Sequence, residues 1–135
     1  MKPTQMLRIV GIVLLASLVL IGCEIAKPKV SISDRLNSFA SHLTESVRSN
    51  VYTDFYPNSN GNTAGAAPSV WVAFPAGSYS VTITDSSNPS AVTAIIYGGG
   101  SFATGRTATF DMGKDGSGDY FINTVTITSG GNFTI

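Results

Sequence analysis

The sequence predicts an α+β domain in which a long N-terminal amphipathic helix packs on an antiparallel β-meander of four to five strands. Two observations predict this class. Apolar residues recur at helical spacing near residue 40, and in the second half of the chain they alternate with polar residues. A helix with one apolar stripe must bury it against a second layer, and a sheet with one apolar face supplies that layer. We therefore expect residues 31–135 to form a single domain.

The helix is predicted over residues 31–47. Ser31 and Asp34 have the spacing of a capping box at its start, and Asp34 suits the positive end of the helix dipole. A short second helix is expected over 51–55, ending before Pro57. The apolar stripe has spacings of four, three, four and four residues and consists of Ile32, Leu36, Phe39, Leu43 and Val47.

Four strands are predicted over residues 79–84, 91–97, 107–112 and 120–127. The turns between them are DSSNPS, GGGSFATG and KDGSG, which contain the Gly, Pro, Asn and Asp residues that turns favour. Consecutive strands with short connections favour an antiparallel meander. An immunoglobulin-like β-sandwich behind a helical spacer is the alternative. The segment GSYSVTITDSSNPS favours it, and an amphipathic helix that must bury its stripe argues against it.

The first 22 residues have the pattern of a secretory signal. Lys2 and Arg8 form a basic region, and residues 9–22 are uncharged and mostly aliphatic. This run is shorter than the roughly 20 apolar residues that a spanning helix needs, so a permanent membrane helix is the weaker interpretation.

The residues around Cys23 resemble a bacterial lipobox, with aliphatic residues followed by a small residue directly before the cysteine (Leu20, Ile21 and Gly22). The resemblance implies a diacylglyceryl group on the thiol, cleavage between Gly22 and Cys23, and a further acyl chain such as palmitate on the new amine. Two or more acyl chains hold a protein stably to a bilayer. Glu24 follows where Asp would favour inner-membrane retention in enteric bacteria, so the outer membrane or cell surface is expected.

The predicted organisation has three parts: a lipoprotein signal peptide over 1–22, a lipidated N-terminus and short tether over 23–30, and the domain over 31–135. The tether reaches about 25 Å at ~3.5 Å per residue, which keeps the domain close to the membrane. The chain has eight basic and eight acidic residues, spread evenly, and so offers no basic face for nucleic acid. Acylation of the single cysteine leaves no thiol for a disulfide.

No residue pattern predicts catalysis, a metal or a cofactor other than the lipid on Cys23. The segment GSFATGRT over 100–107 resembles a phosphate loop, but a strand pattern follows it where that loop needs a helix. Asp111, Asp115 and Asp119 lack the spacing of a calcium loop. His42, the only histidine, is expected to be solvated or packed at an edge, because a catalytic role needs a partner within hydrogen-bond reach.

Aromatic residues gather in the sequence after the helix. We consider Tyr52, Phe55, Tyr56 and Trp71 as candidate walls of a small-molecule pocket. Packing in the core or under a loop is the commoner role of such residues.

Four segments resemble small bacterial lipoproteins of the nuclear-transport-factor-two-like superfamily. They are RLNSFASHL, RSNVYTDFYP, VWVAFP and FDMGKDGSGDYFINTVTI, and the likeness covers residues 31–130. The resemblance implies a curved antiparallel sheet wrapped against a long helix, which forms a cone with an internal pocket. The superfamily includes isomerases, dehydratases and polyketide cyclases beside non-catalytic binding or dimerisation modules. No catalytic residue is carried over.

These observations favour a membrane-anchored extracytoplasmic lipoprotein that acts as a non-catalytic binding or assembly module, either with a protein partner or as a homodimer. An isomerase- or dehydratase-like enzyme is the alternative, and it requires Asp54, Tyr56 or His42 to point into the cone. A purely structural surface lipoprotein is the third hypothesis.

Overall fold

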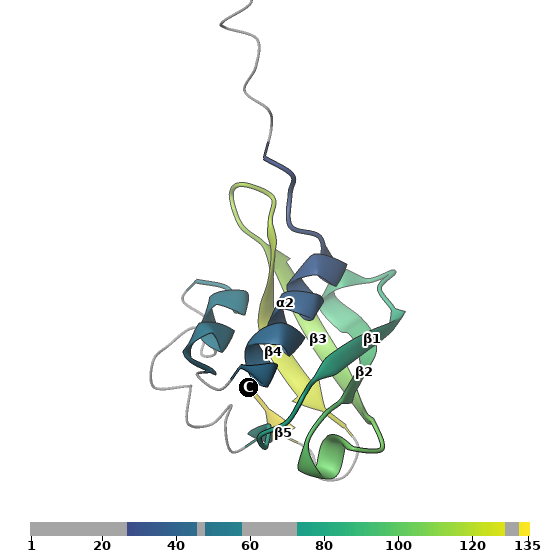
Figure 1. The fold of residues 1–135 in the computed structure, drawn as a ribbon. Helices are drawn as coiled ribbons and strands as arrows, with labels where there is room; N and C mark the ends of the chain where they lie inside the picture. The colour runs from purple at the N-terminus through teal and green to yellow at the C-terminus, as the bar shows by residue number, and fades with distance from the viewer. Residues whose placement is uncertain (1–26, 46–47, 58–72, 129–132) are drawn as a thin grey trace, which may run out of the picture.

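The computed structural model describes residues 27–45, 48–57, 73–128 and 133–135, which form one α-helix and one antiparallel sheet (Figure 1). This arrangement confirms the α+β class. The described residues contain a single sheet with a helix on one face, and not the two packed sheets of an immunoglobulin-like sandwich. In chain order the elements are α2 (Ile32–Thr44), η1 (Arg48–Asp54), β1 (Ser80–Asp85), η3 (Pro89–Ala91), β2 (Val92–Tyr97), η4 (Gly100–Phe102), β3 (Arg106–Lys114), β4 (Tyr120–Ile127) and β5 (Phe133–Thr134).

Helix α2 begins as predicted and ends earlier. The Ser31 hydroxyl accepts the backbone N–H of Asp34, and the Asp34 carboxylate accepts the backbone N–H of Ser31, which completes the capping box. The predicted end at Val47 is wrong for the described residues, because Glu45 already has extended backbone angles. The Thr44 hydroxyl accepts the backbone N–H of Tyr79, which joins this end of the helix to the start of β1. Residues 46–47 lie outside the described residues.

The predicted second helix is present as a 3₁₀-helix, η1, over Arg48–Asp54. The sheet has the order β1-β2-β3-β4-β5, and each neighbouring pair is antiparallel, as expected of a meander. It is an open sheet, with β1 and the two-residue strand β5 at its edges. Irregularities at Ile83/Asp85 and Asp111/Met112 interrupt the register of β1 and of β3.

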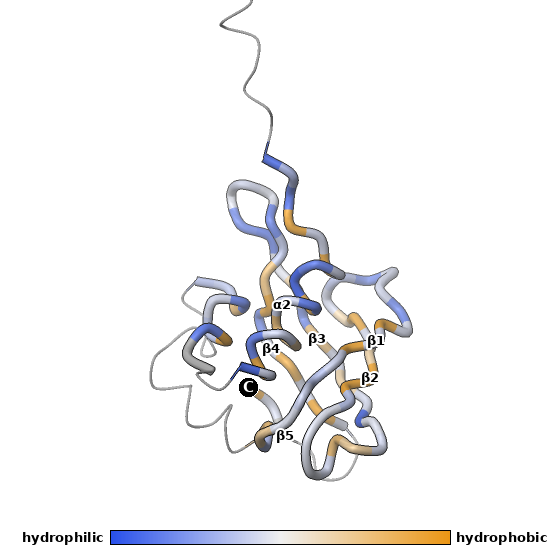
Figure 2. The backbone as a smooth tube through the Cα atoms, viewed as in Figure 1, coloured by the Kyte–Doolittle hydropathy of each residue, from blue (hydrophilic) through white to orange (hydrophobic). Residues whose placement is uncertain are grey.

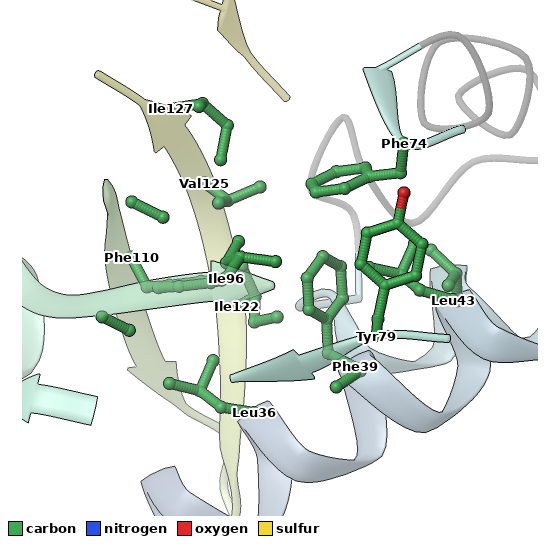
Figure 3. Packing of buried hydrophobic residues seen from close by; sticks show 14 of the residues in the cluster. Leu36, Phe39, Leu43, Phe74, Tyr79, Ile96, Phe110, Ile122, Val125 and Ile127 are labelled. Atoms are coloured by element: carbon green, nitrogen blue, oxygen red, sulfur yellow. The ribbon is translucent and has the colours of Figure 1, made fainter. Parts of the chain in front are cut away.

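The core lies between α2 and one face of the sheet (Figure 3). Leu36, Phe39 and Leu43 of the predicted stripe are fully buried there. Phe39 makes edge-to-face contacts with Phe55, Phe74 and Phe110 at centroid distances of 6.0, 5.7 and 5.9 Å. Figure 2 shows the hydrophobic residues concentrated in the strands, while the turn between β3 and β4 is hydrophilic. The sheet contributes Val92, Ala94, Ile96, Ala108, Phe110, Met112, Ile122, Val125 and Ile127 to this core.

The opposite face of the sheet carries rows of threonine. Thr93 lies opposite Thr109, Thr109 opposite Thr126, and Thr126 opposite Thr134, so one row crosses four strands. Hydroxyl pairs at 2.9 Å (Thr84 with Thr93) and 3.1 Å (Thr126 with Thr134) link parts of this row. Directly opposed threonines stabilise antiparallel sheets, which accounts for the row without a ligand.

The two sides of the sheet differ in how far the outermost long strand, β1 or β4, is covered by other segments. The outer edge of β4 is covered along its length. Phe55 bridges Ile122, the Tyr56 N–H donates to the Ile122 carbonyl at 2.8 Å, and β5 pairs with the second half of the strand. Within the described part of the chain, no strand pairs with the outer edge of β1.

The N-terminal segment is held by the turn between β3 and β4. The Val30 N–H donates to Asp119 Oδ1 at 2.8 Å, and the Tyr120 N–H donates to the Val30 carbonyl at 3.1 Å. The segment before α2 therefore enters the domain beside this hairpin turn (Figure 1). No helix in the described ranges is long and apolar enough to cross a membrane.

Candidate functional site

The most concentrated polar cluster surrounds Asp54, whose side chain is fully buried. Its Oδ1 accepts from the Ser38 hydroxyl at 2.7 Å and from a terminal nitrogen of Arg35 at 3.3 Å. Its Oδ2 lies 2.7 Å from His42 Nδ1. A buried carboxylate persists where donors surround it, and three side chains supply them here.

One face of α2 supplies all three of these partners. Arg35, Ser38 and His42 are spaced three and four residues apart, which places them in one line on a helix. Asp54 is the last residue of η1, and this 3₁₀-helix lies beside α2 (Figure 1). The adjacent stripe of α2, around Phe39, packs into the core, so the cluster joins η1 to the edge of the core.

Arg35 is held from several sides. Its Nε donates to the Tyr120 carbonyl at 2.7 Å, and its guanidinium carbon lies 4.2 Å from the centroid of the Phe121 ring. Tyr56 meets the same Phe121 ring edge-to-face at 6.1 Å. The arginine therefore ties α2 to β4 as well as to Asp54. A guanidinium that bonds two partners and stacks on a ring in this way is not replaceable by lysine.

The His42–Asp54 pair has the geometry of an oriented imidazole. An ionised carboxylate can only accept hydrogen bonds, so Nδ1 of His42 donates and a neutral imidazole keeps its lone pair on Nε2. The His42 side chain is 22% exposed while Asp54 is fully buried. The pair can thus hold a partly exposed imidazole in one tautomer, which is what a general base or a ligand-binding histidine needs.

A groove lies on the other side of α2, between the helix and the start of β1. Its volume is about 470 Å³. Small and polar residues dominate its walls, and Glu45 is the charged residue among them. The lining residues are Asn37, Ala40, Ser41 and Thr44 of α2, Glu45 after it, Tyr79 just before β1, and Ser80 and Val81 at the start of β1.

A second acid, Asp85, ends strand β1. The backbone N–H of Ser87 donates to the Asp85 carboxylate and is the larger cause that lowers the pKa of Asp85 below its ordinary value. A hydrogen bond from the Ser87 side chain is the smaller cause. Asp85 is exposed and therefore charged at neutral pH.

The residues of the candidate pocket have different surroundings. Phe55 is fully buried in the core, where it meets Phe39, and Tyr52 on η1 is 40% exposed. Tyr56 is partly buried and packs against Phe121. Trp71 lies outside the described residues, and so do Gly22 and Cys23 of the lipidation site. The pocket and the lipidation site therefore stay predictions.

The segment that resembles a phosphate loop and the turn that resembles a calcium loop both have structural roles. In the segment 100–107, a 3₁₀ turn is followed by β3, so the strand expected after this loop is present. Asp115 Oδ1 accepts the backbone N–H groups of Ser117 and Asp119 and so shapes the turn. Among the described residues there is no group of three or more His, Cys, Asp or Glu that could hold a metal ion.

Sequence reasoning missed the role of Asp54. It considered His42 beside the apolar stripe but paired it with no acid. A usable signal was present, since Arg35, Ser38 and His42 form a second, polar stripe at helical spacing. Because donors at the border of the core need hydrogen-bond partners, such a line of donors predicts a nearby acceptor.

Comparison with known proteins identifies no relative. No family model matches the chain, and neither a curated protein nor a solved structure is significantly similar to it.

Proposed function

We propose that this chain is a bacterial lipoprotein that is anchored outside the cytoplasm through acyl chains on Cys23 and acts as a binding or assembly module. The anchor is supported by the basic residues at the N-terminus, the apolar run over 9–22 and the small residue before Cys23. The membrane would be the outer membrane or the cell surface, in keeping with Glu24. Because Val30 is held by Asp119, the domain would begin a few residues after the lipid.

The observation that carries a binding role is the groove between α2 and β1. It is open, has a volume of about 470 Å³, and lies beside a sheet edge that no described strand pairs with. Concave sites lined by a few polar groups are where proteins bind partners and ligands. The finer fold that we propose is the nuclear-transport-factor-two-like cone, with a curved sheet against a long helix. The single helix on an antiparallel meander is compatible with it.

A second candidate function is favoured by one observation, the His42–Asp54 pair at 2.7 Å. An isomerase- or dehydratase-like enzyme of the cone fold would use His42 Nε2 as its general base and Asp54 to orient the imidazole. Without an identified substrate, a non-catalytic role is the function that the groove supports better.

The anchor is tested by expressing the full chain and its Cys23→Ser variant in a bacterium grown with an alkyne analogue of palmitate. Wild-type protein should incorporate the label, sediment with membranes and show the mass of residues 23–135 plus acyl chains. The Cys23→Ser variant should remain unlabelled. An unprocessed wild-type mass, or equal labelling of both proteins, would contradict the anchor.

Native mass spectrometry of the membrane-extracted protein separates the two functions. A small molecule that leaves on denaturation, and that the His42→Gln variant fails to retain, would support the enzyme. A bare dimer, or a chain that carries another polypeptide, would support the binding module.

A further inference from the structure

We infer that the outer edge of β1, together with the groove beside it, receives an extended segment of a partner protein as a sixth strand of the sheet. The segment would carry apolar residues at alternate positions and basic residues at its ends. The inference rests on the proposed binding function and names the chemistry of the partner. Strand addition supplies affinity through backbone hydrogen bonds and specificity through alternate side chains.

The first support is the contrast between the two edges. The chain covers the outer edge of β4 with Phe55, Tyr56 and β5, and β5 itself is only two residues long. Short or covered edges are how proteins prevent unwanted strand pairing. In β1 the residues before Asp85 are SVTIT, which contain no proline and no charged residue. Its outer edge is therefore the one that can accept a strand.

The second support is the alternation of side chains along β1. Val81 and Ile83 are partly buried and pack against the core, on the side of α2. Ser80 and Thr82 lie on the threonine side of the sheet and are exposed. An added strand would place one set of side chains beside Ile83 and beside Val81, which lines the groove, and the other set beside the hydroxyls of Ser80 and Thr82. Apolar residues fit the first set and threonine or serine the second.

The third support is charge. Glu45 lies at the end of the groove where β1 begins, and Asp85 lies at the other end of the strand. The described residues that line the groove include no Lys or Arg. Two acids that flank an otherwise uncharged edge favour a segment with a basic residue near each end.

A second copy of the chain fits this edge less well. Antiparallel pairing of β1 with its own copy, centred on Thr82, would bring Asp85 opposite Tyr79 of the other molecule. Tyr79 and Glu45 line the same groove, so two carboxylates would face each other at both ends of the interface. Like charges placed in this way oppose association.

The test is an NMR titration of the full ¹⁵N-labelled chain in detergent with the synthetic peptide KTVTVTK. Two control peptides are used: KTVVTTK, which has the same composition without the alternation, and ETVTVTE. We expect KTVTVTK to shift the amides of β1 and of the groove residues and to slow the hydrogen exchange of β1. Each control peptide should bind at least tenfold more weakly.

A matched pair of variants tests the charges. The double variant Glu45→Lys/Asp85→Lys should lose at least tenfold in affinity for KTVTVTK and should come to prefer ETVTVTE. The control Asp111→Lys changes an acid on β3, away from this edge, and should bind as the wild type does.

Four results would overturn the inference: no binding of KTVTVTK, equal binding of KTVVTTK, shifts centred on β4 and β5, or a peptide-free dimer whose β1 amides are already protected. The test is independent of lipidation. An acylated chain that does not bind the peptide would support the anchor and contradict the docking site. A chain that binds the peptide but carries no acyl group would support the docking site and contradict the anchor.

Discussion

His42 Nδ1 lies 2.7 Å from Oδ2 of Asp54, although the two residues belong to different helices. Asp54 is the acceptor for every side-chain contact described around it, and its carboxylate is fully buried. Removing one member of a buried charged cluster leaves the others without compensation, whereas the intact cluster contributes little beyond an apolar substitute. The cluster therefore acts more as a constraint on how η1 docks than as a large source of stability.

We expect Asp54→Ala to lower the free energy of unfolding by about 3 kcal/mol, near the lower end for a broken buried pair, because Arg35 and His42 can be partly hydrated. Urea unfolding followed by circular dichroism measures this change. Ser38→Ala removes one donor and should cost about 1 kcal/mol.

The variant Asp54→Asn is the matched control for shape. It keeps an acceptor oxygen for Ser38 but loses the charge that Arg35 faces, so its loss should fall between those of the other two variants. If Asp54→Ala unfolds at the same urea concentration as the wild type, the cluster does not hold η1 in the way that its geometry indicates.

Phe39 should be the most costly single truncation in the core. Its fully buried ring meets three other phenylalanine rings edge-to-face. Each such contact contributes stability beyond that of the buried area. Phe39→Ala should lower the free energy of unfolding by about 3–5 kcal/mol. Phe39→Leu keeps most of the volume and should lose clearly less. Thermal unfolding of both variants checks the order, and equal losses would show that ring geometry contributes nothing.

Short-range patterns predicted the elements that depend on them. The start of α2 follows from Ser31 and Asp34, which are three residues apart, and strands β1 and β3 follow from period-two alternation. The end of α2 did not follow, because its last turn is joined to β1 through Thr44 and Tyr79, which are 35 residues apart. No local pattern reports such a contact.

The same limit applies to the candidate site. The partners of Asp54 lie 12 to 19 residues before it, and their contact depends on how η1 packs against α2. Strand β4 carries large residues on both faces, and its sequence alone gives no reason for them. The structure supplies one, since Arg35 and Tyr56 pack against Phe121 from neighbouring elements.

The capping box gives the protein a pH dependence at its acidic limit. The side chain of Ser31, and then its backbone N–H, donate to Asp34 and lower the pKa of this carboxyl below its ordinary value of 3.8. A lowered pKa in the folded state means that the contribution of Asp34 is fully present above the unfolded-state pKa. It is lost as the pH falls through the folded-state pKa.

We therefore expect the stability difference between the wild type and Asp34→Asn to be present at pH 6 and to shrink below pH 3.8. Urea unfolding of both proteins across this range measures it. The variant Ser31→Ala removes the cap hydroxyl and should cost about 1 kcal/mol at neutral pH. A difference that stays constant down to pH 2 would show that the carboxylate charge is not what the cap uses.

The junction between Val30 and Asp119 should control access of proteases to the N-terminal segment. Trypsin can cut after Lys29, whereas Pro28 protects the bond after Lys27. Cleavage next to Val30 requires this residue to leave the hairpin, where Asp119 Oδ1 accepts its N–H at 2.8 Å. Loss of this partly exposed, charge-assisted bond should cost about 1 kcal/mol. The rate of cleavage follows the population of the open form, and 1.4 kcal/mol corresponds to about tenfold.

We expect Asp119→Ala to be cut roughly five times faster than the wild type after Lys29, and Asp119→Asn, which keeps an acceptor, to be cut at an intermediate rate. Asp111→Ala changes an acid of the same hairpin and should leave the rate unchanged. Mass spectrometry of the early fragments measures all four proteins, and equal rates in folded samples would mean that the segment is held elsewhere than at Asp119.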